Sequence, residues 1–164
     1  MFERVLEDLQ ILKSDVKNLL KLANLEKITN IENIGEQLSF STYDELINFN
    51  EKLVDVKYFS KTQYTLSLLG GRDLNDTTKR ILSIIINHQL ALKINWIGAN
   101  EKGSIRKLVN LLKLIYGAIR KNAVCCNATN TEINMAIKTW VKNAPDRAGG
   151  RSGRRKLNLK GYCA

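Results

Sequence analysis

The chain has 164 residues, a single proline and an apolar fraction of 44%, which excludes a disordered chain and predicts one domain with its own hydrophobic core. No apolar run approaches the ~20 residues needed to span a bilayer. The formal net charge of +10 is uneven, because residues 1–60 hold 7 Lys/Arg and 11 Asp/Glu, whereas residues 61–164 hold 19 and 5. This excess predicts a polyanionic partner for the second part, nucleic acid first and an anionic membrane second, unless it serves solubility alone.

Residues 1–27 carry a heptad seam, which predicts a long amphipathic helix. Apolar residues recur there at alternating spacings of three and four, at Phe2, Val5, Leu9, Leu12, Val16, Leu19 and Ala23. We expect a coiled coil that dimerises through Val5, Leu9, Leu12, Val16 and Leu19. The alternative is a helix that packs on its own domain. Residues 28–41 are polar with scattered isoleucines, and we expect a linker there.

The next part of the chain predicts short helices with clear end signals. Thr42 and Glu45 form a capping box, and Gly70-Gly71 provides a left-handed helix end. The expected helices run from the capping box to about Leu53, over about 58–69, from about Asp73 or Asn75 through the apolar run 81–86, and over about 87–93. The isoleucine-rich run at 81–86 is apolar nearly all round, so we place it in the core.

The longest helix of the domain is expected at 104–122, after a loop at 99–103. At ~100° per residue its cationic and amide side chains fall on one stripe, opposite an apolar face, and Gly117 lies in the same stripe. Arginine and asparagine read base edges, and both also bind phosphate. We therefore expect DNA contacts from Arg106, Lys107, Asn110, Lys113, Arg120 and Lys121. The alternative is an ordinary solvated helix face.

A second capping box, Thr129 with Glu132, predicts a last helix to about Asn143. The domain is therefore expected over 42–144, followed by a basic flexible tail at 145–164. The tail residues expected to contact DNA are Arg147, Arg151, Arg154, Arg155 and Lys156. A charged tail without a partner is the alternative.

Catalytic and metal chemistry find little support in the sequence. His88 is the single histidine, and no Cys-x-x-Cys spacing exists, so we expect no enzyme, no metal and no cofactor. The odd count of three cysteines fits a reducing compartment, and Cys125-Cys126 is interpreted as a buried apolar pair. Trp96 and Trp140 are interpreted as core anchors before base-stacking platforms.

Several stretches resemble an uncharacterised domain family of invertebrate proteins, over roughly residues 42–147. They are 68–74, with Gly-Gly-Arg-Asp, 80–82, 90–98, with Asn-Trp-Ile-Gly, 102–103, and 133–147, with Ala-Pro-Asp-Arg. More distantly, 80–121 is similar to the core of the BEN domain. That resemblance implies an all-α fold and DNA binding in chromatin and transcription, or protein interaction. It implies contacts from Lys113, Arg120, Lys121 and the segment 147–156. The helix at 130–143 departs from the BEN pattern.

Together these observations predict an all-α protein, with a compact BEN-like domain of five to six helices preceded by a long N-terminal coiled-coil helix. The expected function is a nuclear, homodimeric DNA-binding module with no membrane partner. The alternative is a protein-interaction or oligomerisation adaptor, and RNA is a less favoured ligand than DNA.

Overall fold

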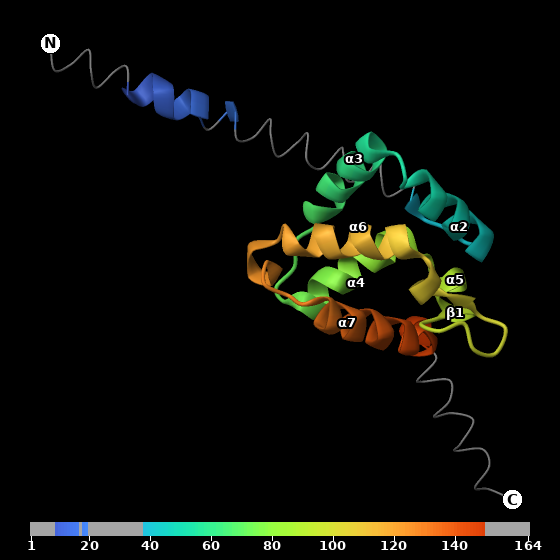
Figure 1. Cartoon of the computed structure of the whole chain (residues 1–164). Helices are drawn as coiled ribbons and strands as arrows, with labels where there is room; N and C mark the ends of the chain where they lie inside the picture. The colour runs from blue at the N-terminus through green and yellow to red at the C-terminus, as the bar shows by residue number, and fades with distance from the viewer. Residues whose placement is uncertain (1–8, 17, 20–37, 150–164) are drawn as a thin grey trace, which may run out of the picture.

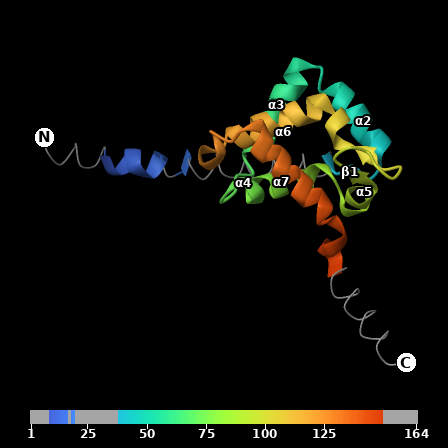
Figure 2. The ribbon, with the colours of Figure 1, turned by 60° about the horizontal axis from the view of Figure 1, so that its bottom comes forward.

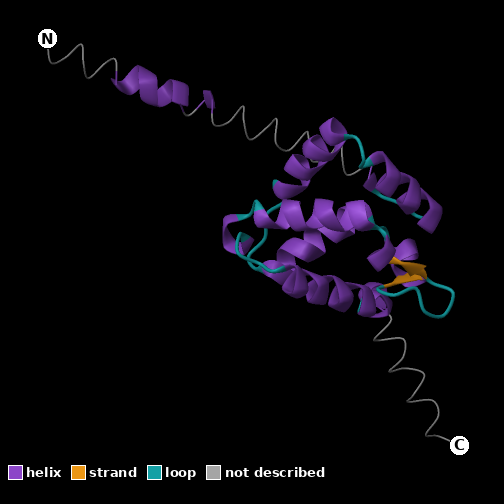
Figure 3. Ribbon diagram, in the orientation of Figure 1, coloured by secondary structure: helices purple, strands orange, loops and turns teal. Residues whose placement is uncertain are grey.

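The computed structural model describes residues 9–16, 18–19 and 38–149, which are mostly helical (Figures 1 and 3). From residue 38 onward the elements are α2 (Tyr43–Lys52), α3 (Val56–Ser67), α4 (Leu74–Ile85), α5 (His88–Lys93), β1 (Ile94–Asn95), β2 (Gly103–Ser104), the 3-10 helix η1 (Ile105–Lys107), α6 (Val109–Arg120), the 3-10 helix η2 (Ala123–Cys125), α7 (Asn130–Lys142) and the 3-10 helix η3 (Ala144–Gly149). None of the helices in these described ranges is both long and apolar enough to cross a membrane.

The core lies between three stacked helices, with α4 between α6 and α7 (Figures 1 and 2). Helices α2 and α3 pack on α6 from the side away from α7. In the run 81–86 the apolar side chains are buried as expected, except that Ile84 is half-buried, and Ser83 is exposed. Each fully buried leucine or isoleucine contributes about 1.5–3 kcal/mol to folding. The core therefore holds α6 in place from both sides.

Local capping explains where most helices begin. Both capping boxes are confirmed, Thr42 with Glu45 at α2 and Thr129 with Glu132 at α7. Helix α3 begins earlier than predicted, because the Asp55 carboxylate accepts hydrogen bonds from the amides of Lys57 and Tyr58. After α3, Gly70 adopts the left-handed conformation, with φ +57°.

The predicted linker at 28–41 is wrong at its end. Leu38 is buried, and Phe40 forms an isolated parallel bridge with Ile86. The Phe40 amide donates to the Ile85 carbonyl at 3.0 Å, and the Asn87 amide donates to the Phe40 carbonyl at 3.1 Å. Residues 38–41 therefore belong to the folded unit. Residues 20–37, where the rest of the linker was predicted, lie outside the described residues.

The single helix predicted at 104–122 is also wrong, because the chain breaks at Leu108, with φ −87° and ψ 74°. The cap of α6 comes from α2, since the Asn50 side chain accepts the Leu111 amide at 3.0 Å. Before the break, β1 and β2 form a parallel pair that the sequence did not predict. The Arg106 amide then donates to the Trp96 carbonyl at 3.1 Å, which ties η1 to β1.

The N-terminal segment is helical over 9–16 and 18–19. The predicted seam residues in it are exposed. Leu12 is 62% and Leu19 is 64% exposed, and at least half of the surface of Leu9 and Val16 is exposed as well. Residues 20–37, which join this segment to the folded unit, lie outside the described residues, so the alternative of an intramolecular helix also stays a prediction. The remaining seam residues, Phe2, Val5 and Ala23, lie outside the described residues. The coiled coil stays a prediction.

Candidate nucleic-acid interface

Three members of the predicted stripe, Asn110, Gly117 and Arg120, make contacts inside the fold. The Asn110 amide donates to the Asn50 carbonyl of α2 at 3.1 Å. Arg120 donates from Nε to the Ala128 carbonyl at 2.9 Å and from Nη2 to the Asn130 side chain. Gly117 faces Gln63 of α3 so closely that a Cβ there would meet its side chain. This part of α6 therefore packs against α2, α3 and the segment before α7, and its predicted DNA contacts stay a prediction.

The other predicted residues near α6 are exposed, but they do not form one stripe. Arg106 and Lys107 lie on η1, before the break, so the helical spacing does not align them with α6. Lys113 is exposed in the middle of α6. Lys121 lies just after α6, with Nζ 5.8 Å from the centre of the Tyr64 ring. The structure therefore spreads these cations along the molecule rather than gathering them.

The predicted tail begins later than expected. Residues 144–149 form η3, and the Arg147 guanidinium stacks on Trp140 with Cζ 4.0 Å from the ring centre. Arg151, Arg154, Arg155 and Lys156 lie outside the described residues. Arg147 is thus the one predicted tail residue that the structure places, and it is half-buried.

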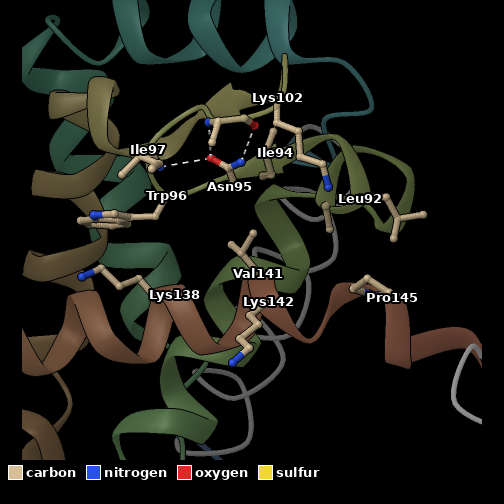
Figure 4. Close-up of a pocket in the computed structure, with 12 residues that line it drawn as sticks. Leu92, Ile94, Asn95, Trp96, Ile97, Lys102, Lys138, Val141, Lys142 and Pro145 are labelled. Atoms are coloured by element: carbon tan, nitrogen blue, oxygen red, sulfur yellow. Dashed lines mark hydrogen bonds between the residues drawn. The ribbon is translucent and has the colours of Figure 1, made fainter.

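A basic pocket that the sequence analysis missed lies between β1, the loop after it and α7 (Figure 4). Its volume is about 470 Å³. Apolar groups form much of its lining, and three lysines stand around it: Lys102 from the loop, and Lys138 and Lys142 from α7. No carboxylate occurs among the described residues that line it. We call this site the basic pocket; its lining residues are Ala91, Leu92, Ile94, Asn95, Trp96, Ile97, Ala99, Lys102, Lys138, Val141, Lys142 and Pro145.

One side chain organises the loop of the basic pocket. The Asn95 Oδ1 atom accepts hydrogen bonds from the amides of Ile97, Gly98 and Ala99, and its Nδ2 atom donates to the Ala99 carbonyl at 2.8 Å. Ile97 is left 63% exposed at the surface of this loop. The loop is therefore a preformed surface with an apolar side chain at its edge.

The rest of the loop is held in an unfavourable backbone conformation. Asn100 and Glu101 both have positive φ, 57° and 59°, which costs a non-glycine residue of order 1 kcal/mol. The β1–β2 pair closes the loop, and the Tyr43 hydroxyl donates to the Ser104 carbonyl at 2.9 Å. Gly103 lies against the Tyr43 ring, where a Cβ would come within 2.3 Å of a ring carbon. Contacts from α2 thus fix the loop that carries Lys102.

Trp96 and Lys138 connect the loop to α7. Lys138 Nζ lies 5.1 Å from the centre of the Trp96 ring, a cation–π distance. Trp96 is half-buried, so the interpretation of both tryptophans as core anchors holds for Trp140 but less well for Trp96. One signal was available in the sequence: Lys138 and Lys142 are four residues apart, which places them on one face of a helix. Their partner Lys102 could not be found by spacing.

The acidic groups of the folded unit largely serve the helix ends. Backbone amides of Ser41 and Thr42 lower the pKa of Glu45, and the amide of Thr129 lowers that of Glu132. The Arg72 amide, with the charges of Arg80 and Arg72, lowers the pKa of Asp76. These carboxylates are committed to local hydrogen bonds at helix starts, away from the basic pocket.

The remaining candidates for chemistry are few. In the part of the chain that the structure describes, no group of three His, Cys, Asp or Glu side chains is placed to hold a metal ion. Cys125 is buried 3.7 Å from the Thr77 hydroxyl, but Cys126 is exposed, so the predicted buried pair is half wrong. The two point to different sides because they end a 3-10 turn. No family model, curated protein or solved structure matches the chain.

Proposed function

We propose that the folded part of the chain binds nucleic acid, with duplex DNA as the first candidate, through the basic pocket. The observation that carries the proposal is that Lys102, Lys138 and Lys142, from two distant segments, line one pocket with no carboxylate among its described lining residues. Lysines bind phosphates as point charges and supply most of the affinity of sequence-tolerant DNA binding. The overall charge of +10 acts in the same direction.

The preformed loop supports this proposal. A loop that is already ordered by Asn95 loses little conformational entropy when it binds a ligand. Trp96 and the exposed Ile97 would meet sugars or base edges while the lysines contact phosphates. Phosphate contacts position a protein on the duplex without reading sequence, so we expect modest sequence preference from this surface.

The resemblance noted above points to the same place. Its stretches 90–98, 102–103 and 133–147 contribute every lining residue of the basic pocket except Ala99. In this proposal the protein acts in the nucleus, in chromatin or transcription, as the similarity to the BEN domain implies. The tail arginines and a dimer formed by the N-terminal seam would add further phosphate contacts, and RNA is the less favoured ligand.

The test compares two triple charge reversals in fluorescence anisotropy with a labelled DNA duplex. Lys102→Glu, Lys138→Glu and Lys142→Glu together are expected to weaken binding at least tenfold. The matched control reverses Lys52, Lys57 and Lys61, three exposed lysines of α2 and α3. If both triple variants bind DNA like the unaltered protein, or lose DNA affinity equally, the basic pocket is not the interface. Single-stranded DNA and RNA of the same sequence then rank the ligands.

A second candidate function is an oligomerisation adaptor, and the exposed N-terminal seam favours it. Leu9, Leu12, Val16 and Leu19 are half to two-thirds exposed. Apolar side chains in heptad register are buried when two such helices pair. We expect a dimer by light scattering, and a monomer when Leu12 and Leu19 are both changed to Asp. The control is Val124→Asp, at an exposed apolar position outside the seam. A monomeric unaltered chain would refute the adaptor, whereas a stable dimer without DNA affinity would favour it over the first proposal.

A further inference from the structure

A second pocket lies where α5 meets the end of α7 and η3, and it has its own polar character. Its volume is about 330 Å³, and its lining residues are Ser83, Ile86, Asn87, His88, Trp140 and Arg147. Trp140 is two residues from both Lys138 and Lys142 in α7, so it projects from the opposite face of that helix. The pocket is therefore separate from the basic pocket. We call it the tryptophan–arginine pocket.

Two hydrogen-bond donors are buried at the tryptophan–arginine pocket without an acceptor. They are Nε1 of Trp140 and Nη2 of Arg147, neither of which has a partner among the described residues. Trp140 as a whole is 8% exposed. In folded proteins about nine in ten buried polar groups are hydrogen-bonded, and an exception calls for an explanation such as an absent ion. Two exceptions side by side indicate a missing acceptor.

The packing of Arg147 fixes the direction of its free donor. The guanidinium lies over the Trp140 ring, with Cζ 4.0 Å from the ring centre, and Nη1 donates to the Trp140 carbonyl. Nη2 is therefore the buried donor of Arg147 that has no acceptor among the described residues. Burial lowers the pKa of Arg147, because the charged guanidinium loses part of its hydration. An anion in the pocket would offset that loss.

We propose that the tryptophan–arginine pocket binds a phosphate group, whose oxygens accept hydrogen bonds from Trp140 Nε1 and Arg147 Nη2. The two donors lie at different levels, because the indole N–H lies in the ring plane and the guanidinium lies over the ring face. A tetrahedral phosphate offers oxygens in several directions, whereas a planar carboxylate suits the paired donors of a free guanidinium fork, and here Nη1 is already occupied. Both nitrogens are covered in the structure, so this proposal requires an outward movement of η3 as the phosphate enters.

The phosphate has two sources of the same chemistry. It is either a free phosphate ion or monoester, or a phosphate of a nucleic-acid backbone. In the second case the inference rests on the proposed function, and it gives the protein phosphate contacts on two faces of α7. The two sources are separated by using inorganic phosphate and a DNA duplex as separate probes.

The experiment follows the indole N–H signals of ¹⁵N-labelled protein by NMR. The chain has two tryptophans, so Trp96 is an internal control for Trp140, and Trp140→Phe assigns the two signals. Inorganic phosphate is titrated against chloride at constant ionic strength. We expect a saturable downfield shift of the Trp140 signal and little change at Trp96. A Trp140 signal that does not move, or that moves linearly together with Trp96, overturns the proposal.

Variants and the DNA probe complete the test. Arg147→Gln is expected to raise the apparent Kd for phosphate at least tenfold, while Arg72→Gln, at an exposed arginine, leaves it unchanged. Unchanged phosphate affinity in Arg147→Gln also overturns the proposal, and the titration of the unaltered protein decides it even if this variant unfolds. When the DNA duplex is the probe, a shift of the Trp140 indole signal assigns the DNA backbone as a source of the phosphate. DNA binding without a shift of this signal assigns free phosphate as the source. Absence of DNA binding refutes the proposed function while the phosphate titration still stands.

Discussion

At the scale of residues, Asn95 is the polar side chain on which the loop of the basic pocket depends most. Asn95→Ala leaves three loop amides without their acceptor, and the loop carries Lys102 and Ile97. We expect the free energy of unfolding to fall by about 1–3 kcal/mol, measured by urea denaturation. DNA affinity should fall as well. Asn127→Ala, at an exposed asparagine, is the control, and equal stability of the two variants would contradict the role given to Asn95.

Residue roles were predictable when the partner atoms are close in sequence. Thr129 and Glu132 cap α7 through bonds that span three residues, and the sequence pattern alone identified them. Asn110 and Arg120 were predicted to contact DNA, and both also form hydrogen bonds inside the fold. Asn110 bonds to Asn50, sixty positions earlier, and a lone stripe of polar side chains does not reveal such a partner. The same limit hid the pairing of Trp96 with Lys138.

At the scale of elements, the start of α7 predicts a specific pH dependence. The Thr129 amide and hydroxyl lower the pKa of Glu132 in the folded state below its value in the unfolded chain. The stabilisation is therefore present above the unfolded pKa and is lost as the pH falls through the folded pKa. Glu132→Gln keeps an acceptor but removes the titration, so the fall of Tm in acid should become shallower.

The matched control for this measurement is Glu51→Gln, an exposed glutamate outside the capping boxes. Its Tm profile should follow that of the unaltered protein. If Glu132→Gln and the unaltered protein lose Tm in parallel between about pH 5 and pH 3, the capping box does not carry the acid sensitivity. The dipole of α7 also favours the negative charge of Glu132 at the start of this helix.

Helices with their own caps were predicted well, and those capped from elsewhere were not. Helices α2, α5 and α7 lie within one or two residues of their predicted limits, because their caps are local side chains. The break at Leu108 was missed because Asn50 of α2 caps α6 across the fold. The β1–β2 pair has two residues in each strand, too few to form an alternating pattern.

At the scale of the whole molecule, the charge distribution favoured a binding function but did not indicate which basic side chains line one pocket. The basic excess after residue 60 is plain in the sequence. The sequence analysis assigned it to α6 because that helix has a polar stripe opposite an apolar face. Packing of α2 and α3 on α6 covers part of that stripe, while folding brings Lys102 beside Lys138 and Lys142. Only the tertiary arrangement identifies this second set.

The central claim is that the lysines of the basic pocket contact nucleic-acid phosphates, and the salt dependence of binding tests it most directly. Each phosphate contact on a DNA duplex contributes about 0.9 to the slope of log K against log salt concentration. Changing Lys102, Lys138 and Lys142 to Gln should therefore reduce the magnitude of that slope by about 2.7. The same change at Lys52, Lys57 and Lys61 should leave it unaltered. Equal slopes for the two triple variants would contradict the account.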